Sequence, residues 1–252
     1  MALNNVKEIT IPVSGTDKSV KKIEDANGNI IWGSASAYPY ELLEYIDIPS
    51  AAYVNLANDG NSNTKVKLDI NVNPSGETSQ INQNLFGSIY YNGSTYYRYH
   101  ITTTSNGLLQ AWYGTGNNAY KNTDIYSNDN SRHTIEINYV SSNTLYVDNV
   151  NKGTYTTPST TNTGQMYLGA RRFNNNGSVS INNYTRDIRI YSAEVIIDTG
   201  TSIFYPVIRK SDNAIGLLKV YNNGAATRFC TSETSTPLVA GPIINEYWNF
   251  TV

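Results

Sequence analysis

Several segments of the chain alternate strictly between apolar and polar residues, and this period-two pattern constrains the fold more than any other feature. Residues 65–72 read Lys-Val-Lys-Leu-Asp-Ile-Asn-Val, and residues 134–140 and 186–191 alternate in the same way. Successive side chains of a β-strand point to opposite faces, so such a segment has one dry face and one wet face. This pattern is typical of antiparallel sheets that pack on one side only.

Asn-Gly and Asp-Gly pairs separate these segments. These residues tolerate positive φ, which tight hairpins with the right-handed twist require. Frequent turns between short alternating segments predict an all-β, antiparallel two-sheet sandwich. Only residues 40–45 could form a helical turn, and that turn would have to end before Pro49. The turn pairs stand at 27–28, 59–60, 92–93, 106–107, 176–177 and 223–224.

Composition excludes several classes of partner. The 252 residues carry a net charge of −2 with no dense Lys/Arg cluster, so we expect no nucleic-acid binding. No apolar run approaches the roughly 20 residues of a membrane span, and no secretory signal is visible at the N-terminus. Cys230 is the single cysteine, which predicts neither a disulfide framework nor a cysteine zinc site. We therefore expect synthesis and folding in a reducing cytoplasm.

The chain divides into an N-terminal arm, residues 1–34, and a body, residues 35–252, whose last part from about 205 forms a hairpin extension. Residues 20–32 of the arm predict a strand, an Asn-Gly turn and a second strand. An isolated two-stranded hairpin is marginal in water, so its apolar side chains must pack on something. That surface is either the body or another protein. In the second case the arm is an anchor, and its anchoring residues are Ile23, Ile30, Ile31 and Trp32.

The central part of the body resembles laminin G-like (LamG) and concanavalin A-like jelly rolls. Four segments match the family in order: 132–139 with its histidine, 145–148 (Leu-Tyr-Val-Asp), 166–170 and 185–191. Arg132 stands where the family has Trp, and Asn149 where it has Gly. The resemblance implies a jelly-roll sandwich and says little about the ligand. It also implies a structural, half-buried role for His133, whereas His100 is expected to lie exposed on a sheet.

The two ends resemble proteins of bacteriophage particles. Residues 204–218, with the motif Arg-Lys-Ser-Asp, are similar to the ending of LamG-like proteins of gut bacteriophages and prophages, and residues 239–242 are similar to their closing segment. Residues 20–32 are similar to N-terminal segments of phage tail and head-fibre proteins, including those of crAss-like Bacteroidales phages. These resemblances imply a virion protein of the head-fibre or tail type. By analogy with such proteins we expect a homo-oligomer, for example a trimer, bound to other capsid or tail proteins.

Catalytic residues are not expected. A glycosidase needs two carboxylates across its sugar site, and concanavalin-like hydrolases carry them in an E-x-D-x-x-E pattern that this chain lacks. LamG-like sandwiches often hold Ca²⁺ at the rim, and its ligands here would be Asp59, Asp124 and Asp129. The preferred interpretation is that these residues form turns, so no cofactor is predicted.

Tyrosines and a tryptophan form the main binding candidates: Tyr91, Tyr96, Tyr97, Trp112 and Tyr113. Aromatic rings stack on sugars, but they also pair across strands and are enriched at subunit interfaces. Packing or an interface is preferred, and a host-surface glycan is the alternative.

The leading hypothesis is therefore a non-enzymatic structural protein on the virion surface, attached by its arm and displaying the sandwich for adhesion. A carbohydrate-binding lectin is the second hypothesis, and a polysaccharide depolymerase is the least favoured.

Overall fold

In the computed structural model the chain is built from β-strands, as the alternation predicts. The structure describes residues 10–13, 16–19, 22–24, 30–33, 39–60, 63–115, 119–138, 143–155, 163–184, 186–197, 200–221 and 226–244. Within these ranges there are strands and turns but no helix, and therefore none with the length and apolarity of a membrane span. Residues 40–42, which were expected to start a helical turn, form a strand that pairs with residues 207–209.

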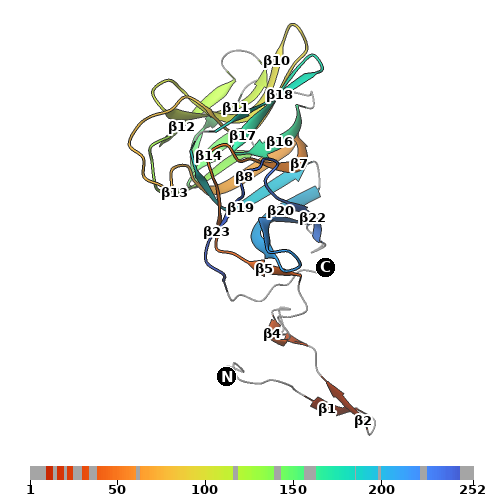
Figure 1. Ribbon diagram of the computed structural model, residues 1–252. Helices are drawn as coiled ribbons and strands as arrows, with labels where there is room; N and C mark the ends of the chain where they lie inside the picture. The colour runs from red at the N-terminus through yellow and green to blue at the C-terminus, as the bar shows by residue number, and fades with distance from the viewer. Residues whose placement is uncertain are drawn as a thin grey trace.

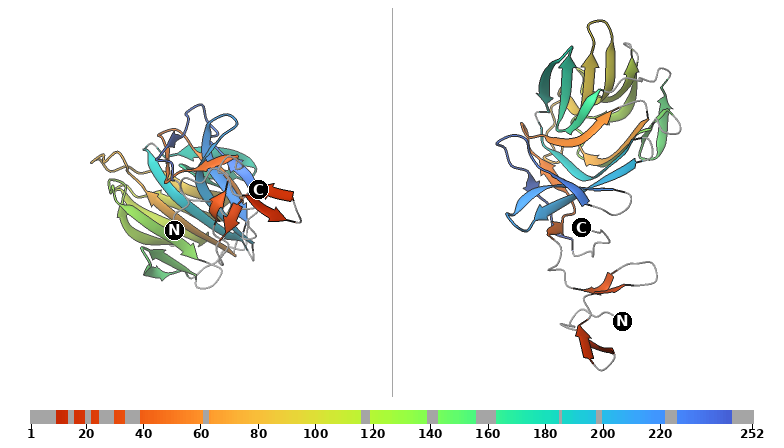
Figure 2. Two further views of the ribbon diagram at one scale, coloured as in Figure 1. Left: turned by 90° about the horizontal axis from the view of Figure 1, so that it is seen from below. Right: turned by 90° about the vertical axis from the view of Figure 1, so that its right-hand side faces the viewer.

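Two large sheets stack as layers, which Figures 1 and 2 show from three directions. The first sheet has the order β12-β11-β10-β9-β16-β7, and β17 and β18 are added beside β9. Its members are β7 (Val54–Gly60), β9 (Asn84–Tyr91), β10 (Tyr96–Thr103), β11 (Leu108–Thr115), β12 (Tyr120–Tyr126), β16 (Gly164–Leu168), β17 (Ala170–Asn175) and β18 (Ser178–Asn183). Ladders in this sheet are antiparallel, with the exception of β17, which runs parallel to β9.

The second sheet has the order β15-β14-β13-β8-β19-β20-β21-β22, with β5, β6 and β23 attached to it. Its members are β5 (Tyr40–Leu42), β6 (Ile46–Ile48), β8 (Thr64–Asn71), β13 (Arg132–Asn138), β14 (Thr144–Val147), β15 (Val150–Thr154), β19 (Ile188–Ile197), β20 (Gly200–Arg209), β21 (Ala214–Tyr221), β22 (Ala226–Cys230) and β23 (Val239–Ala240). The ladder between β8 and β19 joins the first third of the chain to its last third. The fold class predicted from the sequence, an antiparallel two-sheet jelly-roll sandwich, is confirmed.

The core lies between the two sheets and is formed by the apolar set of each alternating strand. In β8 the buried apolar residues are Val66, Leu68 and Ile70, and Lys67 and Asp69 between them lie on the outer face, partly exposed. The first sheet meets them with Tyr99 and Ile101 of β10, which belong to the same buried cluster. Burial of apolar area at about 25 cal/mol per Å² is the main favourable term that holds the layers together.

The C-terminal extension continues the second sheet. β20 and β21 form a long hairpin, and β22 pairs with β21. Phe204 contributes to the main core, whereas Val207, Leu218 and Val220 form a second small cluster with the ring of Phe229.

The arm holds two short hairpins that lie outside the sandwich (Figures 1 and 2). β1 (Thr10–Val13) pairs with β2 (Thr16–Ser19), and β3 (Lys22–Glu24) pairs with β4 (Ile30–Gly33). The second pairing is the hairpin predicted for residues 20–32, with Ile23 opposite Trp32. The side chains of Ile23, Ile30, Ile31 and Trp32 lie outside the described part of the structure, so their anchoring role stays a prediction.

Candidate binding face on the first sheet

The outward faces of the two sheets differ in chemistry. The second sheet presents charged side chains that pair with one another: Lys65 lies 3.4 Å from Glu136, and Arg132 lies 2.7 Å from Asp69. The second sheet also carries rings beside arginines, but Arg132 and Arg189 there are paired with aspartates. The first sheet presents aromatic rings and arginines on β9, β10, β11 and β17, which contain no Asp or Glu. Exposed ion pairs contribute little to stability, and each charge in them already has a partner. Aromatic rings on an outer face can stack on the ring of a ligand. The first sheet therefore carries the candidate site.

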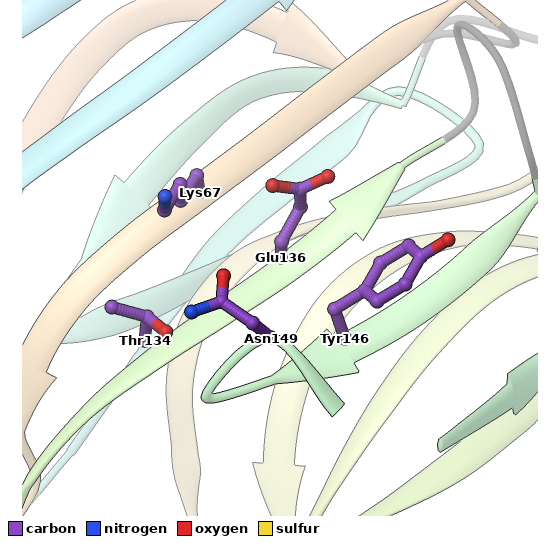
Figure 3. A pocket seen from close by; sticks show the side chains of 5 residues that line it. All are labelled: Lys67, Thr134, Glu136, Tyr146 and Asn149. Atoms are coloured by element: carbon purple, nitrogen blue, oxygen red, sulfur yellow. The ribbon is translucent and has the colours of Figure 1, made fainter. Parts of the chain in front are cut away.

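A shallow pocket of about 220 Å³ lies on the second sheet. Figure 3 shows its lining: Lys67, Thr134, Glu136, Tyr146 and Asn149, which come from β8, β13, β14 and the turn after β14. Glu136 is the only carboxylate among these lining residues. It also accepts a hydrogen bond from the side-chain amide of Asn138 over 2.9 Å, so this carboxylate is already engaged by its neighbours Lys65 and Asn138.

The outward face of the first sheet is defined by period two in β10. Tyr99 and Ile101 point into the core, so Tyr96, Arg98 and His100 point outward. In β11 the same alternation buries Tyr113 and turns Trp112 outward. The register sets His100 opposite Trp112, and their rings stack with centroids 5.8 Å apart at an angle of 6°.

Aromatic rings continue along this face. The ring of Tyr96 stacks on the ring of Tyr91, with centroids 4.4 Å apart, and its centroid lies 6.4 Å from that of Phe173 in β17. Trp112 also contacts Tyr120 of β12 at 4.8 Å. The guanidinium of Arg98 lies 4.8 Å from the ring centroids of both Tyr96 and Trp112. We call Tyr91, Tyr96, Arg98, His100, Trp112, Tyr120, Arg171 and Phe173 the aromatic face.

The predicted aromatic residues separate into three groups. Tyr91, Tyr96 and Trp112 lie together on the aromatic face. Tyr97 stacks on Tyr90 at 5.9 Å on the opposite side of the same two strands. Tyr113 is 1% exposed and packs edge-to-face on Tyr99, so its ring cannot meet a glycan or a partner protein. The prediction that Tyr113 is a contact residue is therefore wrong, because neighbouring residues of β11 point to opposite faces and only Trp112 points outward.

His100 was expected to be exposed, and this prediction is wrong. The side chain is 2% exposed, because Trp112 covers one side and Gly87 allows the neighbouring strand to approach closely. Burial, followed by the charges of Arg171 and Arg98, lowers the pKa of His100 well below its usual value. The imidazole is therefore neutral at pH 7.

Arg98, His100, Arg171 and Phe173 were missed as site residues. Arg98 and His100 could have been found, because they alternate with Tyr96 on one side of a predicted strand. Arg171 and Phe173 reach this face through the parallel pairing of β17 with β9, a long-range contact that no local sequence pattern indicates.

His133 is half-buried and fully engaged, in agreement with the structural role that the resemblance implies. Its Nδ1 lies 2.7 Å from a carboxylate oxygen of Asp148, and its Nε2 lies 3.2 Å from Asp129. The carboxylates also accept backbone hydrogen bonds, Asp148 from Thr134 and Asp129 from Ser131.

The Ca²⁺ candidates do not form a common cluster in the part of the chain that the structure describes. Asp124 pairs with Lys152 at 2.8 Å, and Asp129 contacts His133. The side chain of Asp59 lies outside the described residues. Within those residues no group of three or more His, Cys, Asp or Glu side chains is placed to hold a metal ion. The calcium hypothesis stays a prediction that the geometry does not favour.

Residues 77–189 match the family model of the laminin G domain. This range runs from the loop after β8 to the start of β19, so it contains every strand of the aromatic face. No curated protein matches the chain. The order of the four motifs and the two-layer architecture agree with this match, and the centre of the chain is similar to a laminin G domain.

Proposed function

We propose that the sandwich is a non-enzymatic module for carbohydrate binding and adhesion, and that its ligand binds on the aromatic face. The observation that carries this proposal is the group of Tyr91, Tyr96 and Trp112, with Arg98 between the last two rings, on a sheet surface that the core does not use. Sugar rings present apolar C–H faces that stack on aromatic rings, while arginine and amide groups bind their oxygens. A laminin G-like sandwich is a scaffold compatible with this activity.

The absence of catalysis is part of the proposal. The aromatic strands β9, β10, β11, β17 and β18 contain no Asp or Glu, whereas glycoside hydrolysis needs a carboxylate pair. Turnover of any polysaccharide by the purified protein would contradict this part.

A glycan array probed with the full chain tests the binding proposal. We expect binding to a subset of glycans, and we expect Trp112→Ala or Tyr96→Ala to weaken it by about tenfold or more, because stacking on an aromatic ring contributes on the order of 1 kcal/mol or more. Tyr221→Ala is the matched control, since Tyr221 is a similarly exposed tyrosine on the second sheet. An array without any bound glycan would refute the proposal.

We further propose that the module is displayed on a bacteriophage particle, where the arm attaches it as a head-fibre, decoration or tail protein. Two observations support this second proposal: the resemblance of residues 20–32 and 204–218 to phage proteins, and the position of β1–β4 outside the sandwich (Figure 1). Strand addition to a sheet of another virion protein is a mode of attachment open to such hairpins. Homo-oligomerisation, for example as a trimer, belongs to this proposal.

Deletion of residues 1–33 tests the attachment. We expect the truncated protein to fold and to be missing from assembled particles, whereas the full chain is incorporated. Full incorporation of the truncated protein would exclude the arm as the anchor.

A further inference from the structure

A row of polar side chains crosses the aromatic face at the level of Gly87. His100 lies opposite Trp112 on one side and opposite Gly87 on the other. On the far side of β9, Gly87 pairs with Tyr167 of β16, and the next residue, Ser88, pairs with Arg172 of β17, so Arg171 lies near the level of Gly87. The imidazole of His100 stacks on the indole of Trp112, and it lies close enough to Arg171 for that charge to lower its pKa.

Three buried polar atoms of this row have no hydrogen-bond partner within the described structure: Nδ1 of His100, Nε1 of Trp112 and Nε of Arg171. An unpaired buried polar atom costs about 1–3 kcal/mol, and native proteins contain few of them. Three of them on β11, β10 and β17, with β9 between the last two strands, indicate a place where a ligand supplies the missing partners. Two of the three, on Trp112 and Arg171, are obligatory donors, so the ligand must bring acceptor atoms.

The charge of the row favours an anion. Burial and the neighbouring charge of Arg98 lower the pKa of Arg171 to about 10, and burial also lowers the pKa of Arg98. Both guanidinium groups remain charged at pH 7 and repel each other. Among the six strands β9–β12, β17 and β18 the only acidic residue is Asp124, which pairs with Lys152 of the other sheet. An anionic group between the two arginines would relieve this repulsion.

We propose that the row of Trp112, His100 and Arg171, together with Arg98, is a subsite for the carboxylate of an acidic saccharide such as a uronic or sialic acid. The inference rests on the proposed function, because it names the class of glycan for the same face. A guanidinium is planar and its paired donors match a carboxylate, while Trp112 and Tyr96 offer ring faces to the sugar that bears it.

Isothermal titration of the full chain with matched saccharides tests the subsite. The probes are lactose, sialyllactose and sulfolactose, which share a neutral core, and an oligogalacturonate with its methyl ester. We expect the carboxylated member of at least one set to bind about tenfold or more tightly than its neutral partner, because charge-assisted hydrogen bonds are about twice as strong as neutral ones.

The variants Arg171→Gln and Arg98→Gln should remove this preference, and Arg98→Lys should lose most of it despite keeping the charge, because lysine lacks the planar pair of donors. Arg209→Gln is the control: Arg209 also lies over an aromatic ring, that of Phe229 at 4.4 Å, but on the second sheet. Circular dichroism and the Tm of each variant show whether it folds.

The outcomes separate the two proposals. Equal binding of neutral and carboxylated glycans, unchanged in both Gln variants, would overturn the subsite and leave carbohydrate binding intact. Preference for the sulfated probe alone would overturn the carboxylate assignment. Absence of binding to these probes and to every glycan on the array would overturn the subsite together with the function on which it rests.

Discussion

Gly87 has a backbone conformation, φ +110°, that side chains rarely adopt, and it lies in the middle of β9. A Cβ at this position would lie 2.1 Å from the carbonyl oxygen of Tyr99 and 2.5 Å from Cα of His100. Glycine is therefore required here for two reasons: its positive φ, and the close approach of β10 to the backbone of β9.

We expect Gly87→Ala to lower the free energy of unfolding by about 3–5 kcal/mol, the sum of backbone strain and a collision with backbone that cannot move aside. Gly177→Ala is the matched control, because Gly177 has φ +100° and no atom within 4 Å of the added Cβ. It should cost only the strain, about 1–2 kcal/mol. Urea denaturation measures both values, and equal losses would show that the contact with Tyr99 carries no energy.

Individual strands were largely predictable, because one dry face per strand is a local property. The alternation in 65–72 and in the described part of 134–140 corresponds to β8 and β13, where Val66, Leu68, Ile70, Ile135 and Ile137 are buried. The same rule could have separated Trp112 from Tyr113. It could not have revealed the burial of His100, because that depends on a neighbouring strand without a side chain at Gly87. The partners of a strand depend on the whole topology, so Arg171 and Phe173 could not be assigned to the site.

The loop before β13 and the turn after β14 are joined by His133, which lies between Asp129 and Asp148. Burial raises the pKa of both carboxyl groups, but hydrogen bonds from Ser131, Thr134 and His133 outweigh it, and each pKa is lowered below its usual value. A carboxyl group with a lowered folded-state pKa stabilises the fold above its unfolded pKa of about 4, and this contribution is lost as the pH falls through the folded value.

We therefore expect the Tm of the wild type to fall between about pH 4 and pH 2, the window below the unfolded-state value of an aspartate. The Asp129→Asn/Asp148→Asn variant should have a lower Tm at pH 6 and a smaller further loss in that window. Thermal denaturation from pH 6 to pH 2 measures both. If the Tm of the variant and of the wild type fell equally over this range, groups other than Asp129 and Asp148 would cause the loss of stability in acid.

At the scale of the molecule, the sandwich is stabilised by a buried core, whereas the arm consists of paired strands for which no core is described. The sandwich has a continuous core between two sheets, whereas β1–β2 and β3–β4 form two-stranded ladders that pair only internally. Two-stranded hairpins contribute little stability by themselves. The body therefore contains the elements needed to fold alone.

The variant that lacks residues 1–33 should consequently retain the Tm of the full chain within about 2–4 °C, the shift that about 1 kcal/mol produces in a domain of this size. Differential scanning calorimetry measures this shift. A much larger decrease would mean that the arm packs on the body and is part of its fold.

The parallel pairing of β17 with β9 brings together two segments that are far apart in the chain, and it adds Arg171 and Phe173 to the aromatic face. Arg98 and His100 stand on one side of the junction, and Arg171 and Phe173 stand on the other. A saccharide held by both sides would bind the closed arrangement and not the opened one, so occupancy would suppress detachment of the β17–β18 hairpin by linkage. Occupancy of the subsite would then raise the protection of the β17–β9 pairing against local opening.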